Sequence, residues 1–345
     1  MSDNLVDQAR LCEWMDKEGL GTGPLENLKR LAGGTQNILL SFSRAGRSYV
    51  LRDPPKTTIA DGNETMRREA RVLAAIADTN VPHARLIAAC GDPAVIGTAF
   101  YLMEPVEGFN ATVALPPLHA GDPAIRRQMG FEIVDAVAKL GQVDAIAVGL
   151  SDFGKVENFL TRQTGRWKSQ LDGYARFTEW DGPDALPGVD VIGHWLETNC
   201  PASFTPGIMH GDYHLANVMY RNDGPEIAAI VDWELATLGD PLIDLGWLLA
   251  TWPGDDVDQA RLPVTPWDGF PEADELVEYY AAHSSRDMNG LLWYKVLACY
   301  KLGILLEGTY ARAAAGKADP GVGRMLHDQT IFLFQRALRW LEQNA

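Results

Sequence analysis

The chain has 345 residues, of which 46% are hydrophobic and 22% are charged. This composition is ordinary for a globular protein and excludes the disordered and fibrous classes, while the length favours two lobes around a cleft over one undivided core. The formal net charge of −16 argues against nucleic acid and anionic membrane as partners, because both bind basic surfaces. This charge is compatible with a cationic acceptor, but acidic residues spread along a chain also serve solubility alone.

The sequence lacks the marks of export and of a disulfide framework. No apolar run approaches a length of about 18 residues, and residues 1–4 lack the basic start of a signal peptide. The four cysteines are scattered and form no C-x-x-C pair, so they predict neither a zinc site nor disulfides. We therefore expect a cytoplasmic protein with reduced cysteines that is a monomer or a homodimer.

The N-terminal part of the sequence predicts a helix followed by a small sheet. Apolar side chains at helical spacing predict a helix over 5–19, which Gly19 ends. Short runs of β-forming residues between turn residues predict strands over 27–31, 37–43, 47–51, 86–90 and 98–104. A helical pattern over 64–77 lies between the third and fourth of these strands. This part is predicted to be an antiparallel sheet crossed by one helix.

The turn between the first two strands contains Gly33, Gly34 and Thr35. Glycines let backbone amides approach phosphate groups closely. By itself such a turn is more typical of an ordinary hairpin. Its place ahead of the strand that reaches Arg52 favours a phosphate-binding loop.

A change in composition follows the sheet. The stretch 104–108, E-P-V-E-G, interrupts the apolar runs as a linker does. Beyond it, Asp122 as a cap and Pro123 in the first turn predict a helix over 125–143. From Trp267 onward, aromatic residues recur at helical intervals, which predicts several helices with most of these aromatics in a core.

The stretch around Arg166 and Trp167, with Gln170 and Tyr174, allows two interpretations. Aromatic walls with a few polar groups are typical of ligand sites, which favours the acceptor pocket. A helix that packs its tryptophan in the core is equally compatible with the pattern.

The stretch 207–247 carries the residues that predict chemistry. Its short apolar runs predict strands over 208–209, 218–220 and 227–231. Asp212, Asn217 and Asp232 each stand beside one of these strands. Phosphoryl transfer from a nucleotide needs magnesium across the phosphates and a carboxylate that orients the attacking hydroxyl. The spacing D-x4-N therefore predicts that Asp212 accepts the hydroxyl proton and that Asn217 reaches the metal beside Asp232.

The string H-G-D-x-x-x-x-N over 210–217, followed by I-V-D-W over 230–233, resembles the aminoglycoside phosphotransferase and choline kinase group, small-molecule relatives of the protein kinases. A branch of this group that occurs alone in bacteria, or fused ahead of acyl-CoA dehydrogenases in animals, is more similar still. The shared stretches are V-L-R with P-P, R-W, and D-W-E leading to G-D-P-L-x-D-L-G, within 50–55, 166–167 and 232–246. The resemblance covers nearly the whole chain.

The resemblance implies an α+β fold of the two-lobed protein-kinase-like type. It implies a small antiparallel-sheet N-terminal lobe with one crossing helix over 1–103, a hinge over 104–108, and a larger, mainly helical C-terminal lobe over 109–345. The implied cofactors are ATP, with GTP as the alternative nucleotide, and Mg²⁺.

The resemblance also implies which residues bind the nucleotide. Arg52 stands where protein kinases have a lysine on the third strand, and it keeps the positive charge. Its expected partner is Glu69, the alternative being a solvated surface pair among neighbouring arginines. The resemblance implies two further sets of nucleotide contacts. The turn with Gly33, Gly34 and Thr35 is expected to contact the phosphates, and the hinge backbone at Glu104 and Val106 is expected to contact the adenine.

Within the central motif the resemblance assigns Asp212 as the catalytic base and Asn217 and Asp232 as metal ligands. His214, where protein kinases have a lysine, is a candidate for contact with the transferring phosphate. His210 is expected to support the loop backbone rather than to react.

Three further acidic residues follow the motif. Asp244 resembles the buried aspartate that anchors the catalytic loop in this superfamily. Asp240 precedes Pro241 as a helix cap does, which favours a structural role over metal binding. For Glu234 a second-metal or acceptor role is less favoured than none.

These expectations describe an ATP-dependent kinase that phosphorylates a hydroxyl of a small molecule. The branch resemblance favours a hydroxy acid or a hydroxyacyl thioester, and the wider group leaves an aminoglycoside or an amino-alcohol as the alternative. A nucleotide-binding regulatory module without turnover is a further alternative. Degenerate kinases commonly lose the base or a metal ligand, whereas this chain keeps Asp212, Asn217 and Asp232.

Overall fold

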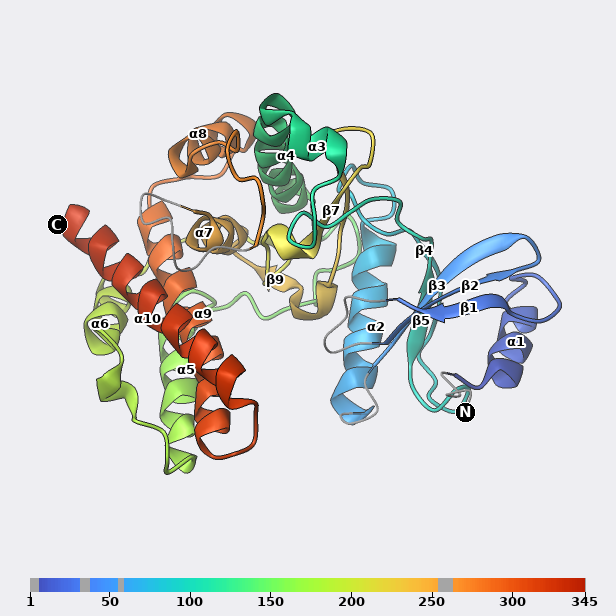
Figure 1. Cartoon of the computed structure of the whole chain (residues 1–345), viewed down its shortest axis with the longest axis horizontal. Coiled ribbons are helices and arrows are strands. Elements are labelled where there is room, and N and C mark those ends of the chain that lie inside the picture. The colour runs from blue at the N-terminus through green and yellow to red at the C-terminus, as the bar shows by residue number, and fades with distance from the viewer. Residues whose placement is uncertain (1–5, 32–37, 55–58, 254–262, 345) are drawn as a thin grey trace.

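The computed structural model describes residues 6–31, 38–54, 59–253 and 263–344, with no account of the side chains of 59–61. Figure 1 shows two lobes, a small one built on a sheet and a larger helical one. The small lobe holds five antiparallel strands in the order β1-β2-β3-β5-β4. Their bounds are β1 Glu26–Arg30, β2 Ile38–Arg44, β3 Arg47–Asp53, β4 Leu86–Cys90 and β5 Phe100–Met103. The predicted antiparallel sheet is confirmed.

Two helices flank this sheet, and they belong to different cores. Helix α1 (Gln8–Lys17) buries Leu11 and Met15 in a core that it shares with alternate residues of the strands. Helix α2 (Ile59–Ala75) lies between the sheet and the larger lobe in Figure 1. Its buried residues belong to the same continuous core as the helices of the larger lobe. The crossing helix therefore packs into both lobes.

Helix α2 begins at Ile59, five residues before the predicted start at 64. The apolar periodicity gives no sign of this first turn, because the first residue that α2 is seen to bury in the shared core is Met66. A tertiary contact marks the early turn instead. A Cβ on Gly62 would come within 2.6 Å of the Pro54 side chain, so the helix passes close to the chain that leaves β3.

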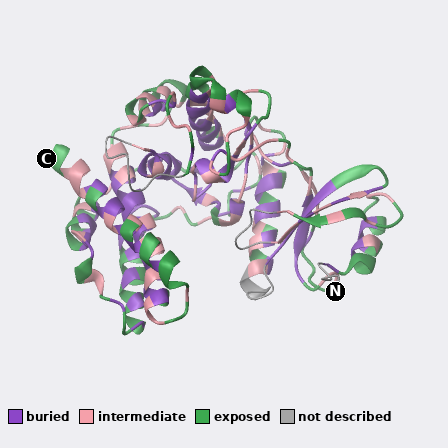
Figure 2. Cartoon of the chain, in the orientation of Figure 1, coloured by how far each residue is buried: buried purple, intermediate pink, exposed green. Residues whose placement is uncertain are grey.

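The larger lobe is mainly helical, as predicted. Its helices are α3 Pro117–Gly121, α4 Pro123–Gln142, α5 Thr161–Asp172, α6 Val189–Thr198, α7 Leu242–Thr251, α8 Ala273–His283, α9 Leu291–Ala314 and α10 Pro320–Gln343. Asp122 caps α4 by accepting a hydrogen bond from the Ala124 N–H at 2.8 Å, and Pro123 lies in the first turn. Figure 2 shows buried residues concentrated along α4, α7 and α9. The predicted aromatic core is confirmed for Trp293, Tyr294, Tyr300, Phe332 and Phe334.

Two short antiparallel sheets lie in the larger lobe. Strand β6 (Gly207–Met209) pairs with β9 (Thr237–Gly239), and β7 (Val218–Tyr220) pairs with β8 (Ile227–Ile230). All four are short and largely buried; β6, β7 and β8 lie at the predicted apolar runs, whereas β9 was not predicted. The segments that join β6 to β7 and β8 to β9 carry the central motif.

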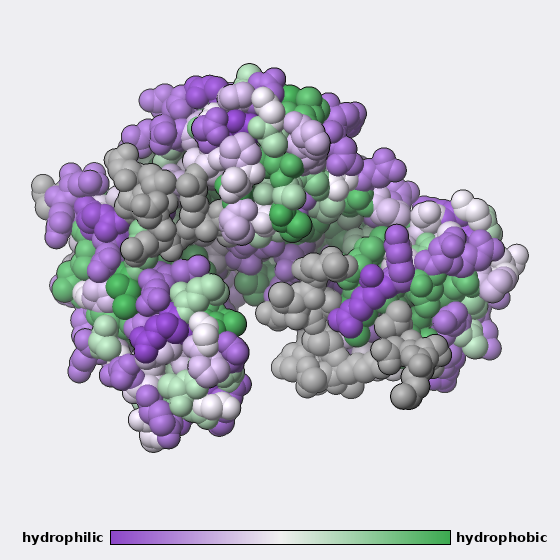
Figure 3. Space-filling view, in the orientation of Figure 1, coloured by the Kyte–Doolittle hydropathy of each residue, from purple (hydrophilic) through white to green (hydrophobic). Residues whose placement is uncertain are grey.

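The segment 104–108 joins the lobes without helix or strand. Phe109, directly after it, exchanges two backbone hydrogen bonds with Tyr220 at 2.8 and 2.9 Å, which attaches the segment to β7. Figure 3 shows this face of the molecule hollowed between the lobes. Within the described ranges, every helix is too short or too polar to cross a bilayer.

Candidate active site

The loop between β6 and β7 brings Asp212 and Asn217 together. The Asn217 Nδ2 group donates to the Asp212 backbone carbonyl at 2.8 Å and to Asp212 Oδ2 at 3.0 Å. Asn217 belongs to a 3₁₀ turn, η3 (Leu215–Asn217), that reverses the chain into β7. The spacing of five residues therefore closes a tight loop whose two polar side chains face each other.

His214 holds the second oxygen of Asp212. Its Nδ1 accepts from the Ala216 N–H at 3.1 Å, so the proton is assigned to Nε2, which lies 3.3 Å from Asp212 Oδ1. Burial alone would raise the pKa of Asp212, but the hydrogen bond from His214 and nearby positive charge, including that of Lys301, hold this pKa below its usual range. The carboxylate is therefore ionised at neutral pH, as a base must be. The phosphate contact of His214 stays a prediction.

The backbone of this loop is fixed from beneath by Asp244 on α7. Its two carboxylate oxygens accept from the His210 N–H at 2.6 Å and from the Gly211 N–H at 2.8 Å. His210 is fully buried, and its Nε2 lies 2.9 Å from the Val231 carbonyl, next to Asp232. Burial lowers the pKa of His210, which keeps the ring neutral. Both residues support the loop in the manner that the resemblance implies.

Asp232 follows β8 in a left-handed conformation, with φ 67° and ψ 61°. A non-glycine residue pays a conformational penalty there, and such residues cluster at functional sites. The Asp232 Oδ1 atom lies 2.5 Å from Arg52 Nη2, which comes from β3 of the other lobe. The first acidic residue of the D-W-E motif is therefore held across the lobe boundary.

Arg52 also makes the predicted pair with Glu69. Arg52 Nε lies 2.9 Å from Glu69 Oε2, and the Tyr101 hydroxyl donates to the same carboxylate at 2.8 Å. Glu69 is only 1% exposed, so the alternative of a solvated surface pair is excluded. Burial raises the pKa of the Glu69 carboxyl to about 7, and the charge of Arg52 opposes this rise. The nucleotide contacts of both residues stay predictions.

The carboxylates at this junction fit a divalent cation. Oxygen atoms of Glu69, Asp232 and Glu234 lie within 4.8 Å of one another, and oxygen ligands of this kind suit Mg²⁺. Glu234 joins this cluster, although its sequence context favoured no metal role. Asn217 lies next to it, because the Asn217 carbonyl accepts from the Val231 N–H at 2.9 Å.

The expected nucleotide contacts fall partly outside the structure. Gly33, Gly34 and Thr35 lie outside the described residues. In the hinge, the Glu104 N–H donates to the Arg85 carbonyl at 2.8 Å. Among the hydrogen bonds of the described chain, none uses the Val106 N–H, which leaves a backbone donor of the kind that adenine accepts.

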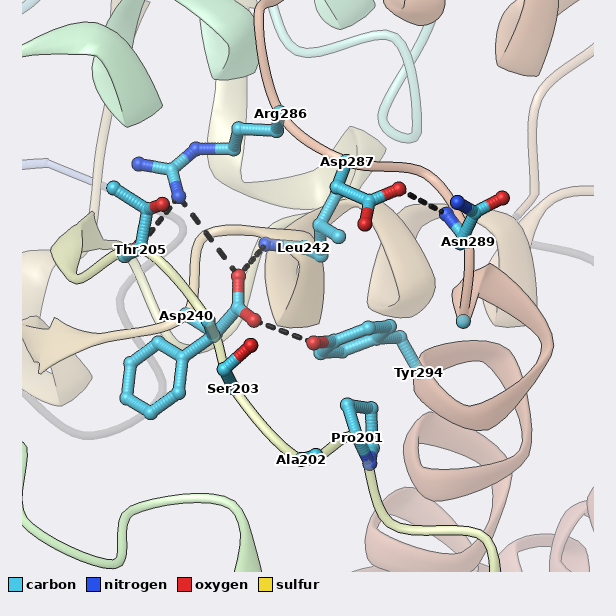
Figure 4. A pocket seen from close by; sticks show the side chains of 12 residues that line it. Pro201, Ala202, Ser203, Thr205, Asp240, Leu242, Arg286, Asp287, Asn289 and Tyr294 are labelled. Atoms are coloured by element: carbon cyan, nitrogen blue, oxygen red, sulfur yellow. Dashed lines mark hydrogen bonds and ion pairs between the residues drawn. The ribbon is translucent and has the colours of Figure 1, made fainter.

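Asp240 lies apart from the carboxylates at the lobe junction and lines a separate cavity of about 360 Å³ (Figure 4). Its carboxylate accepts from the Leu242 N–H at 3.1 Å and from the Tyr294 hydroxyl at 2.5 Å. Arg286 reaches 4.0 Å from the same carboxylate and donates to the Thr205 carbonyl at 2.6 Å. These contacts agree with the structural role predicted for Asp240.

The structure supports the second interpretation of Trp167, that of a helix residue packed in the core. It lies on α5, is 5% exposed, and donates from Nε1 to Gln163 Oε1 at 3.4 Å. Arg166 is exposed, and its Cζ lies 5.0 Å from the centroid of the Trp167 ring.

Sequence reasoning missed two residues that serve the site. Lys301 on α9 is 8% exposed, and its Nζ donates to the Gly211 carbonyl at 2.8 Å. A signal was available, since Lys301 is the one charge in the run V-L-A-C-Y-K-L-G-I-L-L over 296–306. Arg68 on α2, for which the sequence predicted no role, donates from Nη2 to the Phe153 and Ala236 carbonyls at 3.1 Å each. It ties α2 to the larger lobe.

The fold and these side chains are those of a kinase-like phosphotransferase. Residues 27–281 match the profile of the phosphotransferase enzyme family, known as APH. Because this match covers well over half of its length, the chain belongs to the phosphotransferase enzyme family.

Individual relatives agree with this assignment. A candidate aminoglycoside phosphotransferase from Ralstonia eutropha is 29% identical, with a TM-score of 0.78 over 97% of this chain and 99% of that chain. Acyl-CoA dehydrogenase family member 10 of Mus musculus is 28% identical over 86% of this chain but 27% of its own length. Family member 11 of Homo sapiens is 27% identical over 82% of this chain and 36% of its own length. The chain thus spans about a third of these curated relatives.

A more distant structure shows the same fold. Aminoglycoside phosphotransferase APH(4)-Ia, in a ternary complex with AMP-PNP and hygromycin B, is 16% identical, with a TM-score of 0.55 over 94% of this chain and 99% of that chain. The two-lobed kinase-like fold predicted from the sequence is confirmed.

Proposed function

We propose that this protein transfers the γ-phosphate of ATP to a hydroxyl group of a small acceptor, with a hydroxy acid or a hydroxyacyl thioester as the acceptor class. One observation carries the proposal. Asp212, with both oxygens held by His214 and Asn217, lies in the same motif as Asp232, which contacts Arg52 of the other lobe. This arrangement supports Asp212 as the ionised base and Arg52 as the cation that would bind phosphate.

In the proposed reaction the acceptor oxygen attacks the γ-phosphorus, the bond to the β,γ-bridging oxygen breaks, and ADP leaves. The hydroxyl proton passes to the Asp212 carboxylate, which has free lone pairs besides its two hydrogen bonds. Arg52, released from Asp232, binds phosphate oxygens with its planar guanidinium. Asp232, Glu234 and Asn217 would hold magnesium, which when bound neutralises charge on the phosphates.

Two observations support ATP as the donor. The related fold of APH(4)-Ia binds the ATP analogue AMP-PNP. In the described part of this chain, no hydrogen bond uses the Val106 N–H at the hinge, so this group can donate to an adenine ring. GTP remains the alternative nucleotide, and comparing the two donors in the assay decides between them.

The acceptor class rests on relatives and on charge. Both mammalian relatives are named for acyl-CoA dehydrogenases, whose substrates are acyl thioesters. Lys301 lies directly beside the catalytic loop. Arg166 is close enough for its positive charge to add to the effect of burial in lowering the pKa of Lys301. Positive charge beside Asp212 favours an anionic acceptor over a polycationic one, since local contacts rather than the net charge of −16 set specificity.

Aminoglycosides and amino-alcohols form the second candidate class, because APH(4)-Ia binds hygromycin B and a Plasmodium vivax ethanolamine kinase shares the fold with a TM-score of 0.54. The test incubates the protein with ATP, Mg²⁺ and each class in parallel. Mass spectrometry should show a gain of about 80 mass units, one phosphate, on hydroxy acids or their thioesters. Transfer to kanamycin-like amines alone would overturn the acceptor class, and no transfer to any hydroxyl compound would favour a regulatory module.

A further inference from the structure

The peptide bond that joins Gly211 to Asp212 is held at both of its polar ends by buried side chains. Its carbonyl accepts from Lys301 Nζ at 2.8 Å. Its N–H, on Asp212, donates to His210 Nδ1 at 3.3 Å. The preceding peptide bond is held in turn through the Gly211 N–H by Asp244. Because peptide units are planar, fixing two in succession sets the direction in which the Asp212 side chain leaves the backbone.

Gly211 needs this support. Its φ of +88° is in the left-handed region, and a Cβ there would come within 2.5 Å of the Leu235 carbonyl. Glycine has access to many other conformations when its surroundings allow them. The two hydrogen bonds, from Lys301 to the carbonyl and from the N–H to Asp244, select the one that is seen.

Lys301 occupies an unusual place for a cation. It lies on α9, ninety residues after the carbonyl that it binds, and it is 8% exposed. Its ammonium lies 4.2 Å from the ring centroid of Trp247 and 5.5 Å from that of Trp167. Within the described part of the chain, it makes no direct contact with a carboxylate. The groups nearest to the ammonium are thus two indole faces and one peptide carbonyl, with the charges of Asp212 and Asp244 beyond them.

Burying a cation in this way has a cost. Burial lowers the pKa of Lys301 to about 8, and the charges of Asp212 and Asp244 oppose that fall. A methionine would fill the same volume without this cost. The charge is therefore explained by what it does for the loop, namely its hydrogen bond to the Gly211 carbonyl and its field beside the two aspartates.

We propose that Lys301 is a positioning residue for phosphoryl transfer, whose ammonium fixes the Gly211 carbonyl and thereby aims the Asp212 carboxylate at the acceptor. The inference rests on the proposed function, because Lys301 acts only through Asp212. It assigns a role in the reaction to α9, in the C-terminal third of the chain, beyond the residues 27–281 that match the family profile.

The first test is Lys301→Met, which removes the charge but keeps a side chain of similar length and volume. Loss of aim at Asp212 should lower the rate of phosphate release from Mg·ATP, with water as the acceptor, on the order of 10²-fold, since a misplacement of about 1 Å has that effect. The KM for ATP should stay within about twofold, because ground-state binding is unchanged. The melting temperature should stay equal or rise, because a buried charge has been removed. Lys301→Arg, which keeps a cation, should restore part of the rate.

The matched control is Lys295→Met on the same helix. Lys295 also places its ammonium over an indole, 4.3 Å from the centroid of Trp340, but it lies six residues before Lys301 and on a different face of α9. Its replacement should leave the rate unchanged. Equal rates in Lys301→Met and Lys295→Met would overturn the proposal. So would a fall in rate that merely follows a fall in melting temperature, because it would show a structural role only.

A second measurement does not depend on turnover. Hydrogen exchange of the amides of the catalytic loop, followed by mass spectrometry, should be faster in Lys301→Met than in the wild type or in Lys295→Met. Unchanged exchange would overturn the proposal even if the rate falls. If the wild-type protein transfers no phosphate, the proposed function fails, whereas the exchange result still decides whether Lys301 holds the loop.

Discussion

The two halves of the candidate site are held in different ways. Every group that holds Asp212 comes from the larger lobe: His214 and Asn217 bind its carboxylate, and Lys301 binds the carbonyl before it. Asp232 also belongs to the larger lobe, but its partner Arg52 comes from the sheet of the small lobe.

This difference separates the site into two sides. The acceptor side, around Asp212, is preorganised within one lobe, whereas the nucleotide side, around Asp232 and Arg52, forms only when the two lobes meet. The acceptor side stays intact however the lobes sit, because the contacts of Asp212 all lie within the larger lobe. The nucleotide side depends on the distance between β3 and β8, and on the contacts that set it. Changes on the acceptor side should therefore lower the rate of the chemical step, and changes on the nucleotide side should weaken nucleotide binding.

The largest effect is expected for Asp212→Asn. This isosteric change removes the base, so kcat should fall on the order of 10²- to 10⁴-fold. Nucleotide affinity, measured by calorimetry, should stay the same, because the contacts of Asp212 lie on the acceptor side. A rate close to that of the wild type would remove Asp212 from the mechanism, and a loss of nucleotide affinity would break the division into two halves.

A smaller effect is expected for Asp232→Ala. It removes a proposed metal ligand, so the affinity for ATP in the presence of Mg²⁺ should fall at least about tenfold, or roughly 1.4 kcal/mol. Calorimetry with and without Mg²⁺ checks this. The control is Asp223→Ala, which removes an exposed carboxylate that pairs with Arg221 after β7 and should change nothing. Affinity that is independent of Mg²⁺ in the wild type would contradict the assignment.

The smallest effect is expected for Arg68→Met, which removes the two hydrogen bonds from α2 to the Phe153 and Ala236 carbonyls. Each such bond contributes about 1 kcal/mol, part of which solvent replaces, so the KM for ATP should rise a few-fold while kcat holds. Steady-state kinetics measure both. Arg67→Met, which removes bonds to the Gly91 carbonyl inside the small lobe, is the control and should leave KM unchanged. Equal shifts in both variants would show that lobe contacts do not set nucleotide binding.

Local pattern was enough to predict the elements that carry the motif. Strands β6, β7 and β8 lie where short apolar runs predicted them, because a buried strand must be apolar on both faces. The first turn of α2 was not predicted, since it is marked by the close approach of Gly62 to Pro54 and not by periodicity. Trp167 shows the same limit, because an aromatic residue on a helix fits a pocket wall and a core equally well.

For the site, the sequence by itself determined which residues lie close together along the chain, such as Asp212 and Asn217 in D-x4-N, because a tight loop leaves them few arrangements. The resemblance added the pair of Arg52 and Glu69. Only the tertiary structure decided the contacts of Lys301 and Arg68, which join residues 90 and 168 positions apart. Their partners are backbone carbonyls, which every residue has, so no side-chain pattern marks them, and only the packing of α9 and α2 brings them together.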